Sequence, residues 1–159
     1  MTIFIATSCH ATEDRVMQAS TSAQDYGAVA SVGDTPKDMS KFASSDCYGS
    51  ALEDCTARDN DGRQYVFFDG ALSRISMSKK DLRPGAKLPA GILFGEDIEQ
   101  ARRKASSVLR IRFNRAEIDG RIVYSSELSL KSAAGIRYSV ELLADDRGQL
   151  EQVVERTDF

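Results

Sequence analysis

Three cysteines and one histidine are the residues with the most reactive side chains in the sequence. Cys47 and Cys55 lie eight positions apart, with Gly49 and Ser50 between them to let the loop turn back. We expect a disulfide here, which in the chain-entropy model contributes about 2–3 kcal/mol. Two thiols with only His10 elsewhere are too few soft ligands for a metal site, so neither metal nor cofactor is predicted. A pair of free buried thiols is the alternative.

The third cysteine, Cys9, follows an apolar and then small-residue stretch, residues 1–8, which is typical of the end of a lipoprotein signal. The stretch lacks a charged amino-terminal region, and Ala6 stands where leucine is commoner. The alternative is a buried first strand that ends in an inert thiol. A lipidated Cys9 and a disulfide both belong outside the cytoplasm, so we expect the bacterial periplasm, with Cys9 as a candidate outer-membrane anchor.

Acidic residues occur as neighbours at Glu53 and Asp54 and again at Asp145 and Asp146. Neighbouring acids in turns are usually solvated, and a Ser-His-Asp or Cys-His arrangement would have to recruit His10. The glycines are scattered through turns rather than gathered in a phosphate-binding loop. We therefore predict a protein without catalytic residues, and keep a hydrolase built on Glu53 or Asp54 as an alternative.

Composition limits the class of partner. The 159 residues carry a net charge of −3 at pH 7, whereas a nucleic-acid-binding domain needs clustered lysine and arginine. No apolar run approaches the roughly 20 residues that span a bilayer. We expect neither a nucleic-acid partner nor a membrane-spanning helix.

A short helix is predicted to begin near residue 35. Thr35 suits the N-cap and Pro36 the first helical position, while Asp38 suits the positive end of the helix dipole. Met39 and Phe42 supply a short apolar face. Three strand-like segments follow, separated by turn signals: 52–57, 63–68 and 71–77.

A second unit follows a polar linker. Its helix begins near Asp97 and carries one apolar stripe: Ile98, Ala101, Ala105, Val108 and Leu109. Alternating apolar residues then predict strands that contain residues 122–130 and 136–142, and a last strand over 150–156.

These segments predict an α+β protein made of two helix-plus-antiparallel-meander units. The domains are a signal remnant and tether over 1–30, a first unit over 31–80 and a second over 88–159. The repeated order suggests a duplication packed as one compact protein, because an antiparallel meander must cover its apolar face.

The stretch with Gly33, Thr35, Asp38 and Met39, followed by residues 65–72, resembles the helix start and strands of the BamE/SmpA-type outer-membrane lipoproteins. Two such units are similar to the architecture of the β-lactamase inhibitor protein and of several toxin immunity proteins. These resemblances imply an envelope protein that acts by binding another protein.

We therefore expect a protein-binding module, with an inhibitor or immunity protein favoured over an outer-membrane assembly lipoprotein. The partner would be a toxin, an enzyme or an envelope component, and the acidic charge would steer a basic one. Tyr48 and Tyr26 are candidate contact residues, because aromatic side chains dominate binding energy at interfaces. A small-ligand carrier with an apolar cavity is a further alternative.

Overall fold

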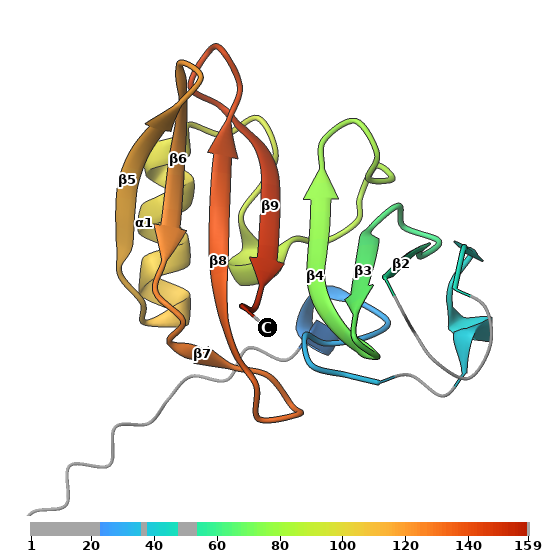
Figure 1. Cartoon of the computed structure of the whole chain (residues 1–159). Helices are drawn as coiled ribbons and strands as arrows, with labels where there is room; N and C mark the ends of the chain where they lie inside the picture. The colour runs from blue at the N-terminus through green and yellow to red at the C-terminus, as the bar shows by residue number, and fades with distance from the viewer. Residues whose placement is uncertain (1–22, 36–37, 48–53, 159) are drawn as a thin grey trace, which may run out of the picture.

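The computed structural model of the chain describes residues 23–35, 38–47 and 54–158. In that part of the chain, nine β-strands form one antiparallel sheet beside one α-helix (Figure 1). The strands are β1 (Ser44–Ser45), β2 (Cys55–Arg58), β3 (Gln64–Phe68), β4 (Ala71–Ser78), β5 (Phe113–Ile118), β6 (Arg121–Ser126), β7 (Leu130–Lys131), β8 (Arg137–Ala144) and β9 (Leu150–Arg156). The helices are α1 (Ile98–Leu109) and the short 3-10 turns η1 (Ala23–Tyr26), η2 (Met39–Lys41) and η3 (Pro89–Gly91).

The strand order is β1-β2-β3-β4-β9-β8-β6-β5, and β7 pairs with β8 off this path. The first meander, β2 to β4, is joined to the second by antiparallel pairing of β4 with β9, from Arg74 opposite Arg156 to Ser78 opposite Gln152. Pairing the two meanders along this line removes two exposed sheet edges. The result is one continuous sheet.

The prediction of two helix-plus-meander units is therefore wrong. Where the first helix was expected, the described residues form only the single 3-10 turn η2. Asp38 rather than Thr35 caps it, by accepting a hydrogen bond from the backbone N–H of Ser40 at 2.8 Å. Met39 and Phe42 offer too little apolar surface to stabilise a longer helix, because helix nucleation is unfavourable and depends on burying a full stripe.

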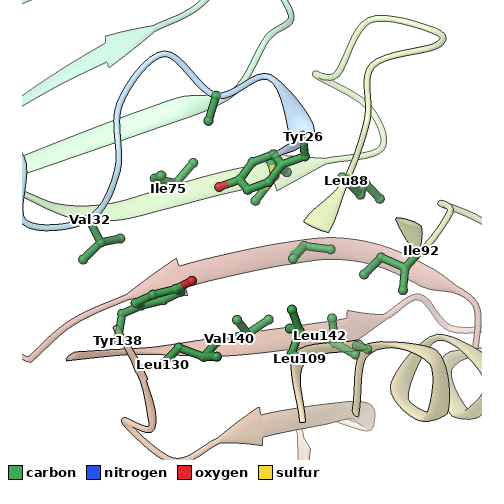
Figure 2. Packing of buried hydrophobic residues seen from close by; sticks show 14 of the residues in the cluster. Tyr26, Val32, Ile75, Leu88, Ile92, Leu109, Leu130, Tyr138, Val140 and Leu142 are labelled. Atoms are coloured by element: carbon green, nitrogen blue, oxygen red, sulfur yellow. The ribbon is translucent and has the colours of Figure 1, made fainter. Parts of the chain in front are cut away.

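The first meander is covered instead by the segment just before Gly33, which the sequence assigned largely to the tether. Tyr26, Ala28, Ala30 and Val32 are all buried in the core. Figure 2 shows Tyr26 and Val32 beside Ile75 of β4, on the opposite side of the core from residues of β8 and α1. An irregular segment, rather than the expected helix, thus covers the apolar face of this half of the sheet.

The second meander is covered by α1, which begins where the sequence predicted. The Asp97 side chain caps it by accepting hydrogen bonds from the N–H groups of Glu99 and Gln100, at 3.0 and 3.1 Å. Four of the five predicted stripe residues are buried: Ile98, Ala101, Ala105 and Leu109. The fifth, Val108, is 52% exposed, and its placement in the buried stripe was wrong.

The strand predictions agree better with the structure. β9 covers residues 150–156 as predicted, and β3 and β4 differ from the predicted bounds by one residue each. No helix in the described ranges is long and apolar enough to cross a membrane.

Candidate functional site

A large hollow lies along the connection between β4 and α1. It holds about 760 Å³, and we refer to it as the β4–α1 groove. Its deepest lining residues are buried: Tyr26, Leu82, Leu88 and Ile92. Two aliphatic side chains stand out at its surface, Leu93 at 64% exposed and Val108 at 52%. The groove therefore combines an apolar floor with apolar side chains presented to solvent.

The chain is held in this shape by backbone hydrogen bonds to neighbouring elements. Gly95 donates to the carbonyl of Leu150 at 2.9 Å, and Leu150 donates back to Glu96 at 2.8 Å. The Glu96 side chain accepts from the N–H of Leu93 at 2.8 Å. Together these bonds fix the turn that presents Leu93, so its exposure follows from a defined backbone.

Arg63, directly before β3, forms hydrogen bonds with two residues that line the groove. Its side chain is fully buried, and Nη2 donates to the carbonyls of Tyr26 at 2.6 Å and Lys87 at 3.1 Å. Nη1 donates to the carboxylates of Asp59 at 3.1 Å and Asp61 at 2.8 Å. One guanidinium thus joins the amino-terminal segment, the β2–β3 turn and the β4–α1 connection.

The electrostatics of this cluster keep Arg63 charged. Burial alone would lower the pKa of Arg63, but hydrogen bonds to Asp61 and Asp59 outweigh it and raise the pKa. For Tyr65, burial raises the pKa, and the Tyr65 hydroxyl donates to Asp59 at 2.8 Å. Removing one partner from such a cluster leaves uncompensated charges in the interior.

Glu155 of β9 is a second buried charge-bearing group near the groove. It is 3% exposed, and the Tyr26 hydroxyl donates to its Oε2 at 2.6 Å. Burial raises the pKa of Glu155 to about 7, against the lowering effect of the Tyr26 hydrogen bond and of Arg63. Glu155 does not line the groove, whereas Tyr26 does, so this carboxyl is not presented to a substrate.

The charged side chains that line the groove are mostly basic. Lys79, Arg83 and Lys87 are exposed, and the one acid among the lining residues is Asp25. Arg83 also forms an ion pair with Asp61 at 2.7 Å. The rim therefore has a positive balance on a chain whose net charge is −3.

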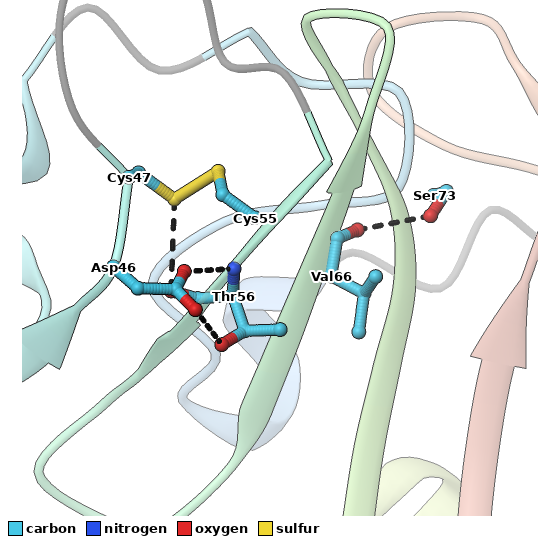
Figure 3. The surroundings of a disulfide bond; sticks show 6 residues. All are labelled: Asp46, Cys47, Cys55, Thr56, Val66 and Ser73. Carbon is cyan, nitrogen blue, oxygen red and sulfur yellow. Dashed lines mark hydrogen bonds between the residues drawn. A yellow bond between two sulfur atoms is a disulfide. The ribbon is translucent and has the colours of Figure 1, made fainter.

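A second hollow, of about 580 Å³, lies beside the disulfide. Cys47 and Cys55 are bonded, with their Cα atoms 5.2 Å apart, and Asp46 accepts hydrogen bonds from Thr56 next to them (Figure 3). Asp46 and the two sulfurs lie within 4.8 Å of one another, but sulfurs bonded to each other offer no thiolate to a metal. The hollow holds charges of both signs, which include Asp54 and Arg156, and one exposed aromatic residue, Phe68.

The other predicted site residues are placed unevenly. Tyr26, a candidate contact residue, is 3% exposed and bonded to Glu155. Tyr48, Cys9, His10 and Glu53 lie outside the described residues. Among the paired acids, Asp145 caps the β8–β9 turn, where hydrogen bonds from the N–H groups of Gln149 and Arg147 lower its pKa.

Sequence reasoning missed the buried charged residues beside the groove, Arg63 and Glu155, and the exposed Leu93 that lines it. Arg63 alternates with Tyr65 and Phe67, and Glu155 with Val153, so strand periodicity would have placed both charged residues on the buried face. For Leu93 no comparable signal exists, because its exposure depends on the irregular backbone of the connection.

Comparison with known proteins adds little. No protein-family model matches the chain, and no curated protein matches it. Among solved structures, it is similar to an extracellular protein containing an SCP domain from Bacillus anthracis str. Ames, with a TM-score of 0.44 and 10% sequence identity. The match covers 98% of this chain but only 50% of that one. A likeness of this degree carries no information on what this chain does.

Proposed function

We propose that this chain is a non-enzymatic protein-binding module, and that the β4–α1 groove receives a segment of the partner. The observation that carries the proposal is the pair Leu93 and Val108, two exposed aliphatic residues that line a hollow with an apolar floor. Neighbouring exposed aliphatic side chains over an apolar hollow are typical of interaction surfaces. Charge and shape then define what the groove accepts.

The partner segment that fits is acidic with apolar anchors. Apolar side chains would occupy the floor over Leu88 and Ile92, and carboxylates would face Lys79 and Lys87 on the rim. The net charge of the chain favours a basic partner in solution, but the charge beside the groove has the opposite sign. Contact charge is what sets register once the two molecules meet.

An oxidising compartment such as the bacterial periplasm fits this module, because the Cys47–Cys55 disulfide persists there and is rare in the cytosol. Within that setting we propose an inhibitor or immunity protein, which occupies a toxin or an enzyme. The hollow beside the disulfide is the weaker binding candidate, since its charges of both signs define no single partner chemistry.

The experiment is a random peptide library displayed on phage and selected against the full chain. We expect the enriched peptides to contain apolar residues flanked by aspartate or glutamate. The affinity of a synthetic copy of the best peptide is then measured by fluorescence anisotropy. We expect the Leu93→Ser and Val108→Ser variants to bind this peptide at least about tenfold more weakly than the parent. Ile118→Ser is the matched control, because Ile118 is 56% exposed on β5 and away from the groove.

Equal affinity of the peptide for the parent and for Leu93→Ser would reject the groove as the binding surface, and so would a selection without enrichment. If the groove variants do lose affinity, a photo-crosslinking residue at position 93, used in cell envelopes, would identify the natural partner. An envelope-assembly component in place of a toxin or an enzyme would overturn the inhibitor assignment and leave the binding role.

A further inference from the structure

The two ends of the sheet differ in what they leave unpaired. At one end β1 is only Ser44–Ser45, and two residues are too short to recruit another strand. At the other end β5 is six residues long and has no partner on its outer side among the described strands. It forms the left edge of the sheet in Figure 1. An open edge of that length carries a row of unpaired N–H and C=O groups.

β5 is also uncovered on its faces. From Asn114 to Ile118 every residue is exposed, although its inner neighbour β6 contains buried residues such as Tyr124. The helix α1 contacts β6 through Tyr124 and also packs against β8.

The charges on β5 have a self-complementary order. Arg115 and Glu117 are two positions apart and so lie on the same face of the strand, with Nη2 of Arg115 4.0 Å from Oε2 of Glu117. In an antiparallel pair of two β5 strands centred on Ala116, Arg115 of each copy stands directly opposite Glu117 of the other. Opposite charges in directly facing positions stabilise a strand pair.

Neighbouring registers lack this match. Centring the pair on Arg115 places two arginines opposite each other, and centring it on Glu117 does the same with two glutamates. Single-sign charges on an edge would only prevent pairing. The alternation on β5 instead permits pairing with one partner, a strand of the same sequence running in the opposite direction.

We propose that β5 joins two copies of this chain edge to edge, in a two-fold dimer centred on Ala116 with two Arg115–Glu117 pairs. The helices of the two copies then lie on the same face of the joined sheet, because the two-fold axis is perpendicular to it. The groove residues Leu93 and Val108 take no part in this contact, so a test of the dimer is independent of a test of the proposed function.

Sedimentation-velocity ultracentrifugation at low salt tests the dimer over a concentration series. The chain is run as its Cys9→Ser variant, so that an intermolecular disulfide does not contribute. We expect the parent to dimerise and R115E and E117R each to be monomeric. R112E is the matched control, since it makes the same charge change at an exposed residue just before β5 and should leave the dimer intact.

Mixing is the decisive step. An equimolar mixture of R115E and E117R restores both opposite-charge pairs between unlike chains, so a heterodimer should form although neither variant dimerises alone. The double variant R115E/E117R should also dimerise. A monomeric parent throughout the series, single variants that dimerise like the parent, or a mixture that stays monomeric would each overturn the proposal.

Discussion

Two arginine–tyrosine–glutamate clusters in this protein share an arginine–ring contact and a tyrosine–carboxylate hydrogen bond but differ in their surroundings. Arg63 lies over the ring of Tyr26 at 5.6 Å, and the Tyr26 hydroxyl donates to Glu155. Arg102 lies over the ring of Tyr124 at the same distance, and that hydroxyl donates to Glu99. The Arg63 side chain is fully buried, whereas those of Arg102 and Glu99 are 28% and 45% exposed.

We expect burial to set how much each cluster contributes to stability. At the surface, water screens the charges and replaces lost partners, so such pairs contribute little. In the interior the partners of Arg63 include two carboxylates and three backbone carbonyls, and the Asp59 side chain among them is as buried as the guanidinium. In the irregular first half of the molecule, Arg63 therefore adds a buried polar cluster to the apolar core, whereas α1 joins the second half by apolar packing.

The largest expected effect comes from removing the buried guanidinium. Arg63→Met should lower the free energy of unfolding by about 3–5 kcal/mol, because it removes the cation that faces the buried Asp59 carboxylate and the donor to three backbone carbonyls. Arg102→Met is the matched change and should lower it by no more than about 1 kcal/mol. Urea unfolding followed by circular dichroism measures both. Similar losses in the two variants would contradict the comparison.

A second difference between the clusters is pH dependence. The pKa of Glu155 is raised from 4.5 to about 7, so the folded state holds this proton more tightly than the unfolded state. The stabilisation is complete below pH 4.5 and is lost as pH rises through 7, by about 3 kcal/mol in total. Glu155→Gln should remove this component of the pH dependence, because a neutral amide replaces the titrating carboxyl.

The measurement is the free energy of unfolding of parent and variant between pH 4.5 and 8. The difference between the two should shift in favour of the variant as pH rises. Glu99→Gln is the control, since it leaves Glu155 in place and should retain the corresponding dependence of the parent. A constant difference between parent and Glu155→Gln across this range would show that Glu155 does not titrate there.

The smallest expected effect tests the turn that presents Arg63. Gly62 has φ +92°, and a Cβ there would come within 2.0 Å of the backbone oxygen of Asp81. Gly62→Ala should therefore lower the free energy of unfolding by about 2 kcal/mol or more. Gly85→Ala has a similar positive φ with nothing near the added atom, and should lower it by only about 1 kcal/mol. Equal effects in thermal or urea unfolding would show that the close approach to Asp81 is not what requires glycine.

Part of the fold was predictable from local pattern. Residues 150–156, which follow the turn signal at 145–148, were predicted as a strand and form β9. The spacing of Ile98, Ala101, Ala105 and Leu109 predicted α1, with its start near Asp97. These signals are local, because side-chain direction in a strand or helix follows from backbone periodicity alone. Val108 is an exception, because its spacing predicted a place in the buried stripe, whereas in the structure it is exposed and lines the groove.

The arrangement of the halves was not predictable in the same way. The expectation of a duplication depended on a first helix, and the cover came instead from residues around Tyr26 and Val32, most of which had been assigned to the tether. Nor did either meander show in its own sequence that β4 would pair with β9. Edge strands have similar patterns whether they end up paired with another meander or exposed.

The sequence by itself determined β3, β4, β9, the amphipathic helix α1 and the acidic charge of the chain, because each depends on neighbouring residues or on composition. Only the tertiary structure decided that Arg63 and Glu155 are buried, that Leu93 and Val108 share a groove, and that β5 is left at the edge. These properties depend on which segments fill the same space, and residues far apart in the chain supply those segments. Tyr26 and Glu155 lie 129 positions apart, and only the tertiary structure brings them into contact.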